Sequence, residues 1–210
     1  MSLVTDKFVF AHLPKTGGQH IRRVIQELGI TGEEVCQHHA SSFAMPKRGI
    51  NLPTLISIRH PVTWYQSRWY HRIRIGWMPL HPIDWECASN DFNQFVQNVM
   101  DYDPNGRLTS LTKLFLYKKR NQRVEHIIKN EQLTDGLFRF LIKMGYDVTR
   151  EQINNVPRTN TSGKIGQTAK DVAIYKPEIL KQLLEKESWL INEFYDGITD
   201  PSILTDQFVV

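Results

Sequence analysis

Several features that would place a chain in a special class are scarce in these 210 residues. There are only two cysteines, Cys36 and Cys87, far apart and without CxxC spacing, so neither a disulfide framework nor a zinc site is expected. No apolar run approaches the roughly 18–20 residues that span a bilayer, and no segment resembles a signal peptide. We therefore expect a cytoplasmic protein without a membrane span.

The chain also has no large excess of positive over negative residues, or of negative over positive. Lys and Arg number 26 against 22 Asp and Glu, which gives a formal net charge of +4. This mild excess, together with the lack of a recognisable nucleic-acid motif, argues against a nucleic-acid partner but suits a small polyanionic ligand. The chain does have 40% hydrophobic residues and no repeat or low-complexity linker, so one well-buried core is expected.

Strand-like apolar runs alternate along the chain with segments whose apolar residues recur at helical spacing. Strands are expected at 7–13, 34–38, 52–58 and 124–128. Helices are expected at 19–28, after Pro61, around 92–99, at 135–144 and over most of 169–194. This rhythm predicts a single α/β domain covering residues 1–210, with a central parallel sheet flanked by helices.

The segment FVFAHLPKTGGQHIRRVI joins the first expected strand to the first expected helix. Its paired glycines, Gly17 and Gly18, allow the backbone to curl so that successive N–H groups converge. The helix that follows adds its unpaired N–H groups and the positive end of its dipole, and Lys15 adds a full positive charge. A strand, turn and helix of this kind predict a phosphate or sulfate site. The motif is not Walker A, because the lysine precedes the glycines.

A second cluster, LISIRHPVTWYQSRW, follows the strand expected at 52–58. A magnesium-dependent kinase or NTPase needs an acidic residue near such a strand end to hold its metal, but this chain has Arg59 there. The Arg59 guanidinium can fork onto a phosphate, and the Ser67 hydroxyl can donate to another phosphate oxygen. The segment therefore predicts a second phosphate site, and no metal is expected.

PKTGG after the first strand, followed by RHPxxxxxS after the third, resembles the sulfotransferases that use 3′-phosphoadenosine 5′-phosphosulfate (PAPS). The resemblance implies a P-loop NTPase-like sulfotransferase fold. It also implies that the 5′-phosphosulfate is held by the first loop, at Lys15, Thr16, Gly17 and Gly18, and the 3′-phosphate by Arg59 and Ser67. Gln19 and His20 stand where the family usually has Thr or Ser hydroxyls, and an amide or imidazole can also donate hydrogen bonds.

Two later segments extend the resemblance to about Lys164. IIKNEQLTDGLFRFLIKMG looks like the family's strand, acidic residue and helix. PRTNTSGK is similar to the late loop that closes over the nucleotide, which implies nucleotide contacts in that loop from Arg158, Asn160, Ser162, Gly163 and Lys164.

The resemblance implies transfer of a sulfuryl group from PAPS to a hydroxyl of an acceptor, which we expect to be a carbohydrate or glycoconjugate. Lys15 is suited to stabilise the leaving oxygen, and a histidine is suited to take the acceptor's proton. His38 and His39 follow the second expected strand, whose end should face the same crevice as the phosphate loop, and either can be the base. His20, within the loop, is a rival.

Two other classes of function stay open. A P-loop nucleotide kinase or NTPase is disfavoured by the lysine that precedes the glycines and by the lack of an obvious metal-binding aspartate. The other class is a nucleotide-binding module that keeps the fold without the chemistry. Affinity for adenosine 3′,5′-bisphosphate, the product of sulfuryl transfer, distinguishes the sulfotransferase from the kinase.

Overall fold

The computed structural model describes residues 2–35, 49, 51–79, 81–118, 122–157 and 169–204. These residues form two compact units, and each is described here by itself. The first unit contains the described residues up to Arg59, those from Thr112 to Pro157, and Leu204. The second contains those from His60 to Leu111 and from Ala169 to Ile203.

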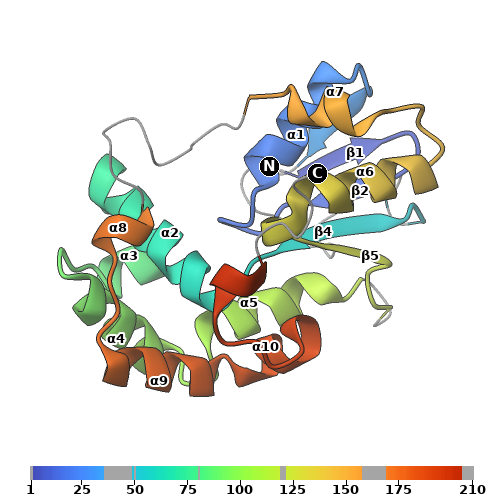
Figure 1. Cartoon of the computed structure of the whole chain (residues 1–210). Helices are drawn as coiled ribbons and strands as arrows, with labels where there is room; N and C mark the ends of the chain where they lie inside the picture. The colour runs from blue at the N-terminus through green and yellow to red at the C-terminus, as the bar shows by residue number, and fades with distance from the viewer. Residues whose placement is uncertain are drawn as a thin grey trace. The chain divides into compact units, whose positions relative to one another are not determined.

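A five-stranded sheet forms the centre of the first unit (Figure 1). Its strands are β1 (Ser2–Thr5), β2 (Val9–Ala11), β3 (Gly32–Val35), β4 (Thr54–Ile58) and β5 (His126–Lys129), in the order β3-β1-β2-β4-β5. β4 is parallel to β2 and to β5, whereas β1 is antiparallel to β2 and to β3. The α/β class expected from the sequence is confirmed, but the sheet is mixed and only partly parallel.

The antiparallel pairing of β1 follows from the shortness of its link to β2. Only residues 6–8 connect the two strands, and a link of this length joins antiparallel neighbours, because a parallel pair needs a long crossover. The Thr5 hydroxyl closes the turn by accepting hydrogen bonds from the backbone N–H groups of Lys7 (3.2 Å) and Phe8 (2.9 Å). The sequence does not reveal β1, because four residues are too few for a recognisable pattern.

Three helices cover one face of this sheet: α1 (Gly18–Glu27), α6 (Leu133–Lys143) and α7 (Arg150–Asn154) (Figure 1). A 3-10 turn, η4 (Asn130–Gln132), links β5 to α6. Their apolar side chains share one core with the strands, which includes Phe8, Phe10, Ile21, Val24, Ile25, Leu55, Leu137, Phe140 and Leu141. Burial of each large apolar side chain contributes about 1.5–3 kcal/mol, so this core anchors both ends of the β2–α1 connection.

The edge strand β3 runs in the same direction as β2, because both are antiparallel to β1. Its carboxyl end, at Val35, therefore lies at the same edge of the sheet as the end of β2. Residues 36–48 follow β3, and the candidate bases His38 and His39 lie there, outside the described residues.

Helices make up the second unit. They are α2 (Pro61–Ile75), α3 (Pro82–Glu86), α4 (Phe92–Tyr102), α8 (Ala169–Val172), α9 (Pro177–Lys186), α10 (Ser188–Tyr195) and the 3-10 turn η5 (Pro201–Leu204). A further helix, α5 (Arg107–Leu116), begins in this unit and ends in the first. None of the helices within the described residues is long and apolar enough to cross a membrane.

The second unit contains a fully buried carboxylate, Glu187, at the junction of α9 and α10. Its two oxygens accept four hydrogen bonds. These come from the Tyr65 hydroxyl (2.9 Å), the backbone N–H groups of Leu108 and Thr109 (both 2.8 Å) and the Thr109 hydroxyl (2.7 Å). Leu108 and Thr109 lie in the first turn of α5, where N–H groups have no acceptor within the helix. Glu187 therefore caps α5 from a distant part of the chain.

Candidate functional site

The loop between β2 and α1 has two residues in the left-handed region of the backbone map. Lys15 has φ 63° and Gly17 has φ 89°. For a residue with a side chain this conformation costs about 1–2 kcal/mol, whereas glycine adopts it freely. Strained residues of this kind persist only where their surroundings hold them, and they are common at ligand sites. The strained backbone therefore makes this loop a candidate ligand site.

Two residues from the end of β4 hold the loop. The Thr16 hydroxyl is fully buried, donates to the Leu13 carbonyl (2.8 Å) and lies 2.8 Å from the Ser57 hydroxyl. Because Thr16 gives its one hydroxyl hydrogen to Leu13, Ser57 is the donor to Thr16. Arg59 Nη1 donates to the Lys15 carbonyl at 3.3 Å. Thr16 thus uses its side chain within the protein, and only its backbone can serve a ligand.

The two glycines of the loop are required by close packing. A Cβ atom on Gly17 would lie 2.5 Å from Asn130 Oδ1, and one on Gly18 would lie 2.0 Å from Cδ2 of His12. The His12 ring is buried and stacked on Phe10 at a centroid distance of 5.8 Å, so it cannot easily move aside. The start of α1 therefore sits directly on side chains that follow β2 and β5.

The carboxyl ends of the parallel strands bring these groups to one edge of the sheet. The β2–α1 loop follows β2, Arg59 follows β4 and Asn130 follows β5. Ligands of open α/β sheets bind outside the carboxyl ends of such strands. We define these residues, Lys15–Gly18 with Arg59 and Asn130, as the loop site. The sequence did not indicate Asn130 as part of the loop site, nor Ser57 and His12 as the side chains that support it.

The loop site is electrostatically suited to an anion. Gly17 is the N-cap of α1 without a side-chain cap, and the first turn of α1 has no acidic residue. Its leading N–H groups lack intrahelical acceptors and carry the positive end of the helix dipole. Lys15 and Arg59 are both partly exposed and add two cationic groups. Gln19, in the first turn of α1, is exposed, whereas His20 is buried.

The remaining residues expected at the site lie in the second unit or outside the described residues. Ser67 is partly exposed on α2 of the second unit. The first turn of α2 is fixed by His60, whose Nδ1 accepts from the Val62 N–H (3.3 Å) and whose Nε2 donates to the Ile198 carbonyl (2.9 Å). The late-loop candidates lie outside the described residues, and these are Arg158, Asn160, Ser162, Gly163 and Lys164.

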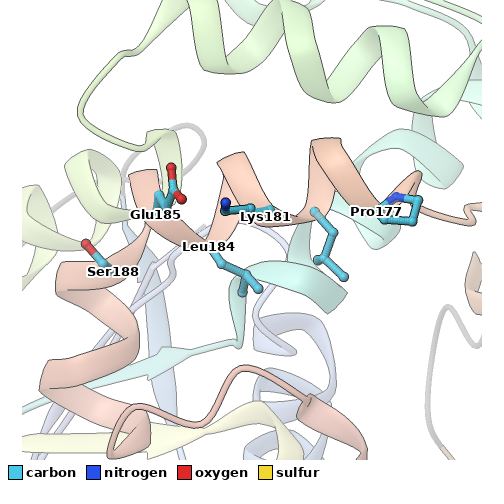
Figure 2. Close-up of a pocket in the computed structure, with 6 residues that line it drawn as sticks. Pro177, Lys181, Leu184, Glu185 and Ser188 are labelled. Atoms are coloured by element: carbon cyan, nitrogen blue, oxygen red, sulfur yellow. The ribbon is translucent and has the colours of Figure 1, made fainter.

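A groove elsewhere contains none of the expected site residues. It has a volume of about 480 Å³ and lies along α9 and the start of α10 (Figure 2). Its lining is Pro177, Leu180, Lys181, Leu184, Glu185 and Ser188. No cluster of His, Cys, Asp and Glu suited to a metal ion occurs in the part of the chain that the structure describes.

Comparison with protein-family models, with curated proteins and with solved structures finds no match to this chain. The resemblance of PKTGG and RHPxxxxxS to sulfotransferase motifs therefore rests on these residues alone.

Proposed function

We propose that this chain is a PAPS-dependent sulfotransferase with a P-loop-like fold that transfers a sulfuryl group to a carbohydrate hydroxyl. The observation that carries the proposal is the strained loop between β2 and α1, held by Ser57 and Arg59 at the carboxyl ends of parallel strands. The left-handed backbone conformation of Lys15 costs free energy, and strain of this kind is common at sites that bind a ligand. A highly charged donor would be such a ligand.

The donor would bind through backbone N–H groups and through cationic side chains. Backbone N–H groups at Gly17 and Gly18 and the Lys15 ammonium would hold the 5′-phosphosulfate. Arg59 engages the Lys15 carbonyl through Nη1, and its other N–H groups would fork onto the 3′-phosphate. By resemblance, Ser67 and the late-loop residues would add hydrogen bonds to the nucleotide.

Sulfuryl transfer requires in-line positioning and neutralisation of the charge that builds on the bridging oxygen. PAPS supplies the sulfuryl group. Lys15 would neutralise the bridging oxygen, and His38 or His39 would take the proton from the acceptor hydroxyl. No step in this scheme requires a metal ion.

We expect adenosine 3′,5′-bisphosphate to bind the wild-type protein in the presence of EDTA, as measured by isothermal titration calorimetry. Lys15→Ala and Arg59→Ala should each weaken binding roughly 10- to 100-fold, because each removes a charge-assisted contact to phosphate. Arg23→Ala is a matched control. This residue is also an arginine of the first unit, but it lies on the α1 surface and pairs with Glu27 at 3.6 Å.

Two results would contradict the proposal. Tighter binding of ATP than of adenosine 3′,5′-bisphosphate, and only with magnesium, would indicate a nucleotide kinase. Tight binding of the bisphosphate, without transfer of labelled sulfate from PAPS to any of a broad panel of carbohydrates, would indicate a non-catalytic nucleotide-binding module.

A further inference from the structure

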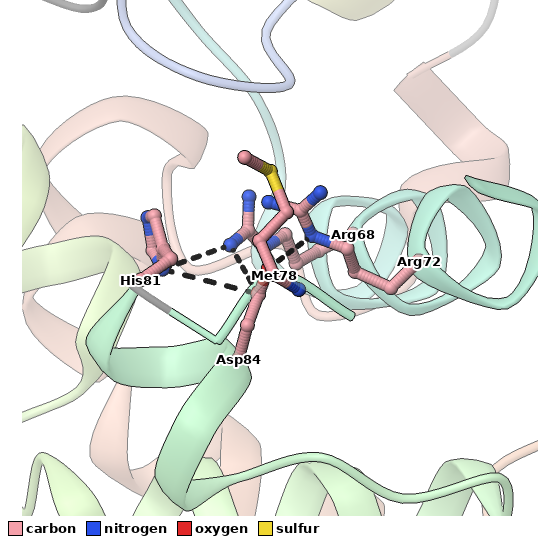
Figure 3. Close-up of polar contacts among 5 residues, drawn as sticks. All are labelled: Arg68, Arg72, Met78, His81 and Asp84. Carbon is pink, nitrogen blue, oxygen red and sulfur yellow. Dashed lines mark hydrogen bonds and ion pairs between the residues drawn. The ribbon is translucent and has the colours of Figure 1, made fainter. Parts of the chain in front are cut away.

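A buried cluster of charged side chains lies within the second unit and includes none of the loop-site residues (Figure 3). Arg68 and Arg72, one turn apart on α2, both contact Asp84 of α3. Arg68 Nη2 lies 2.7 Å from Asp84 Oδ1, and Arg72 Nε lies 2.6 Å from Asp84 Oδ2. The three residues are only 7%, 5% and 2% exposed, respectively.

The charges of this cluster do not balance. Two guanidinium groups face one carboxylate, and Asp84 is the only acidic partner of either arginine among the described residues. His81 Nδ1 lies 3.3 Å from Arg68 Nη2, and burial followed by the Arg68 charge lowers the pKa of the His81 ring, which disfavours its charged form. Burial also lowers the pKa of Arg68, to about 10, and the nearby charges of Arg72 and Arg107 contribute. The cluster therefore carries an excess positive charge on side chains that are almost fully buried.

At least one hydrogen-bond donor of the two arginines also lacks an acceptor among the described residues. Arg68 Nε is buried and has no hydrogen-bond partner within the described part of the chain. Figure 3 shows guanidinium nitrogens of the cluster turned away from Asp84. His81 Nδ1 lies 3.3 Å from Arg68 Nη2 and the His81 side chain is 42% exposed, so the cluster lies close to the protein surface. A buried guanidinium donor without an acceptor is costly, and an anion would satisfy it.

We propose that Arg68 and Arg72 form a binding site for one oxyanion group, a carboxylate or a sulfate, on the side opposite Asp84. Such a group would neutralise the excess charge and accept from the planar guanidinium forks, whose geometry matches both kinds of oxyanion. The site uses neither Lys15 nor Arg59 and does not rest on the proposed function. The group can belong to a free inorganic anion or to an acidic carbohydrate.

The test is calorimetric titration at low ionic strength with sodium sulfate, methyl glucuronide and, as a neutral control, methyl glucoside. The Lys15→Ala protein is used as the background, because it separates this site from the loop site. We expect one saturable anion site that persists in Lys15→Ala. Adding Arg72→Gln should weaken it roughly 10- to 100-fold, because one charge-assisted contact is lost.

The matched control is Arg74→Gln, an exposed arginine on the same helix, which should leave anion binding unchanged. Arg72→Lys keeps the charge but loses the planar fork, so its affinity should be intermediate. Tighter binding of methyl glucuronide than of sulfate would support an acidic carbohydrate as the source, and the reverse order would support a free anion. No saturable binding in Lys15→Ala, or binding unaffected by Arg72→Gln, would overturn the proposal.

Circular dichroism and the Tm show whether Arg72→Gln folds. If it does not, crystals of the wild-type protein soaked in selenate give a second test. An anomalous peak beside the guanidinium groups of Arg68 and Arg72 is then expected, and its absence at saturating selenate would overturn the site.

Discussion

Replacing Gly18 with alanine is expected to destabilise the first unit by about 3 kcal/mol, the upper range for overpacking, and to abolish binding of adenosine 3′,5′-bisphosphate. Helix propensity alone would favour alanine by up to about 1 kcal/mol. The new Cβ would lie 2.0 Å from His12 Cδ2, and that ring is confined by its stacking on Phe10. Relief requires moving the start of α1, which displaces the N–H groups of the loop site. Urea denaturation followed by far-UV circular dichroism measures the stability, and calorimetry measures the binding.

Two comparisons isolate the steric cause. Gly29→Ala places a side chain at φ 69°, with no atom within 4 Å of the new Cβ, so only a backbone cost of about 1 kcal/mol and intact binding are expected. The double variant His12→Ala/Gly18→Ala should be more stable than the sum of the single effects, because the ring that clashes is absent. Strict additivity of the two substitutions would show that His12 does not confine Gly18.

Replacing Glu187 with alanine is expected to lower the free energy of unfolding by about 3–5 kcal/mol, the usual cost of breaking a buried charged network. The change leaves four buried donors without their acceptor, two of them N–H groups in the first turn of α5. Glu185→Ala is the matched control, since this glutamate is exposed on α9, and an effect within about 0.5 kcal/mol is expected. Equal unfolding free energies for the two variants would contradict the capping role of Glu187.

Glu187 also predicts how stability depends on pH. Burial raises the pKa of its carboxyl, although hydrogen bonds from Thr109, Leu108 and Tyr65 act in the opposite direction. In the folded protein the group therefore takes up its proton at a higher pH than in the unfolded chain, where the pKa is about 4.5. Between those two pKa values the folded state binds more protons, so stability decreases as the pH rises. Relative to Glu187→Gln, the wild type should gain stability as the pH falls toward 4.5. A gain on raising the pH would contradict the assignment.

The sequence predicts the elements of the fold better than their pairing. The strands expected at 7–13 and 52–58 correspond to β2 and β4, and the helix expected at 19–28 corresponds to α1. The spacing of apolar residues along the chain indicates which segments are buried, and these three segments have clear apolar patterns. The direction of β1 depends instead on the length of a short link and on the Thr5 hydrogen bonds, which periodicity does not encode.

The loop site, too, could be predicted from the sequence only in part. Two adjacent glycines after an apolar strand indicate a curled backbone, so Lys15–Gly18 could be found from the sequence. The support from Ser57 and the contacts of His12 and Asn130 depend on neighbouring strands meeting at one sheet edge. The Arg68–Asp84 pair likewise joins two helices, and no local pattern predicts which carboxylate will meet which arginine.

The central claim is that the backbone of the β2–α1 loop binds the phosphate groups of the donor. Amide resonances of ¹⁵N-labelled protein, titrated with adenosine 3′,5′-bisphosphate in EDTA, test this directly. We expect the largest shifts at the N–H groups of Thr16, Gly17 and Gly18, and we expect smaller shifts in Lys15→Ala at the same sub-saturating ligand concentration. Unchanged loop amides at a ligand concentration that saturates binding would contradict the account.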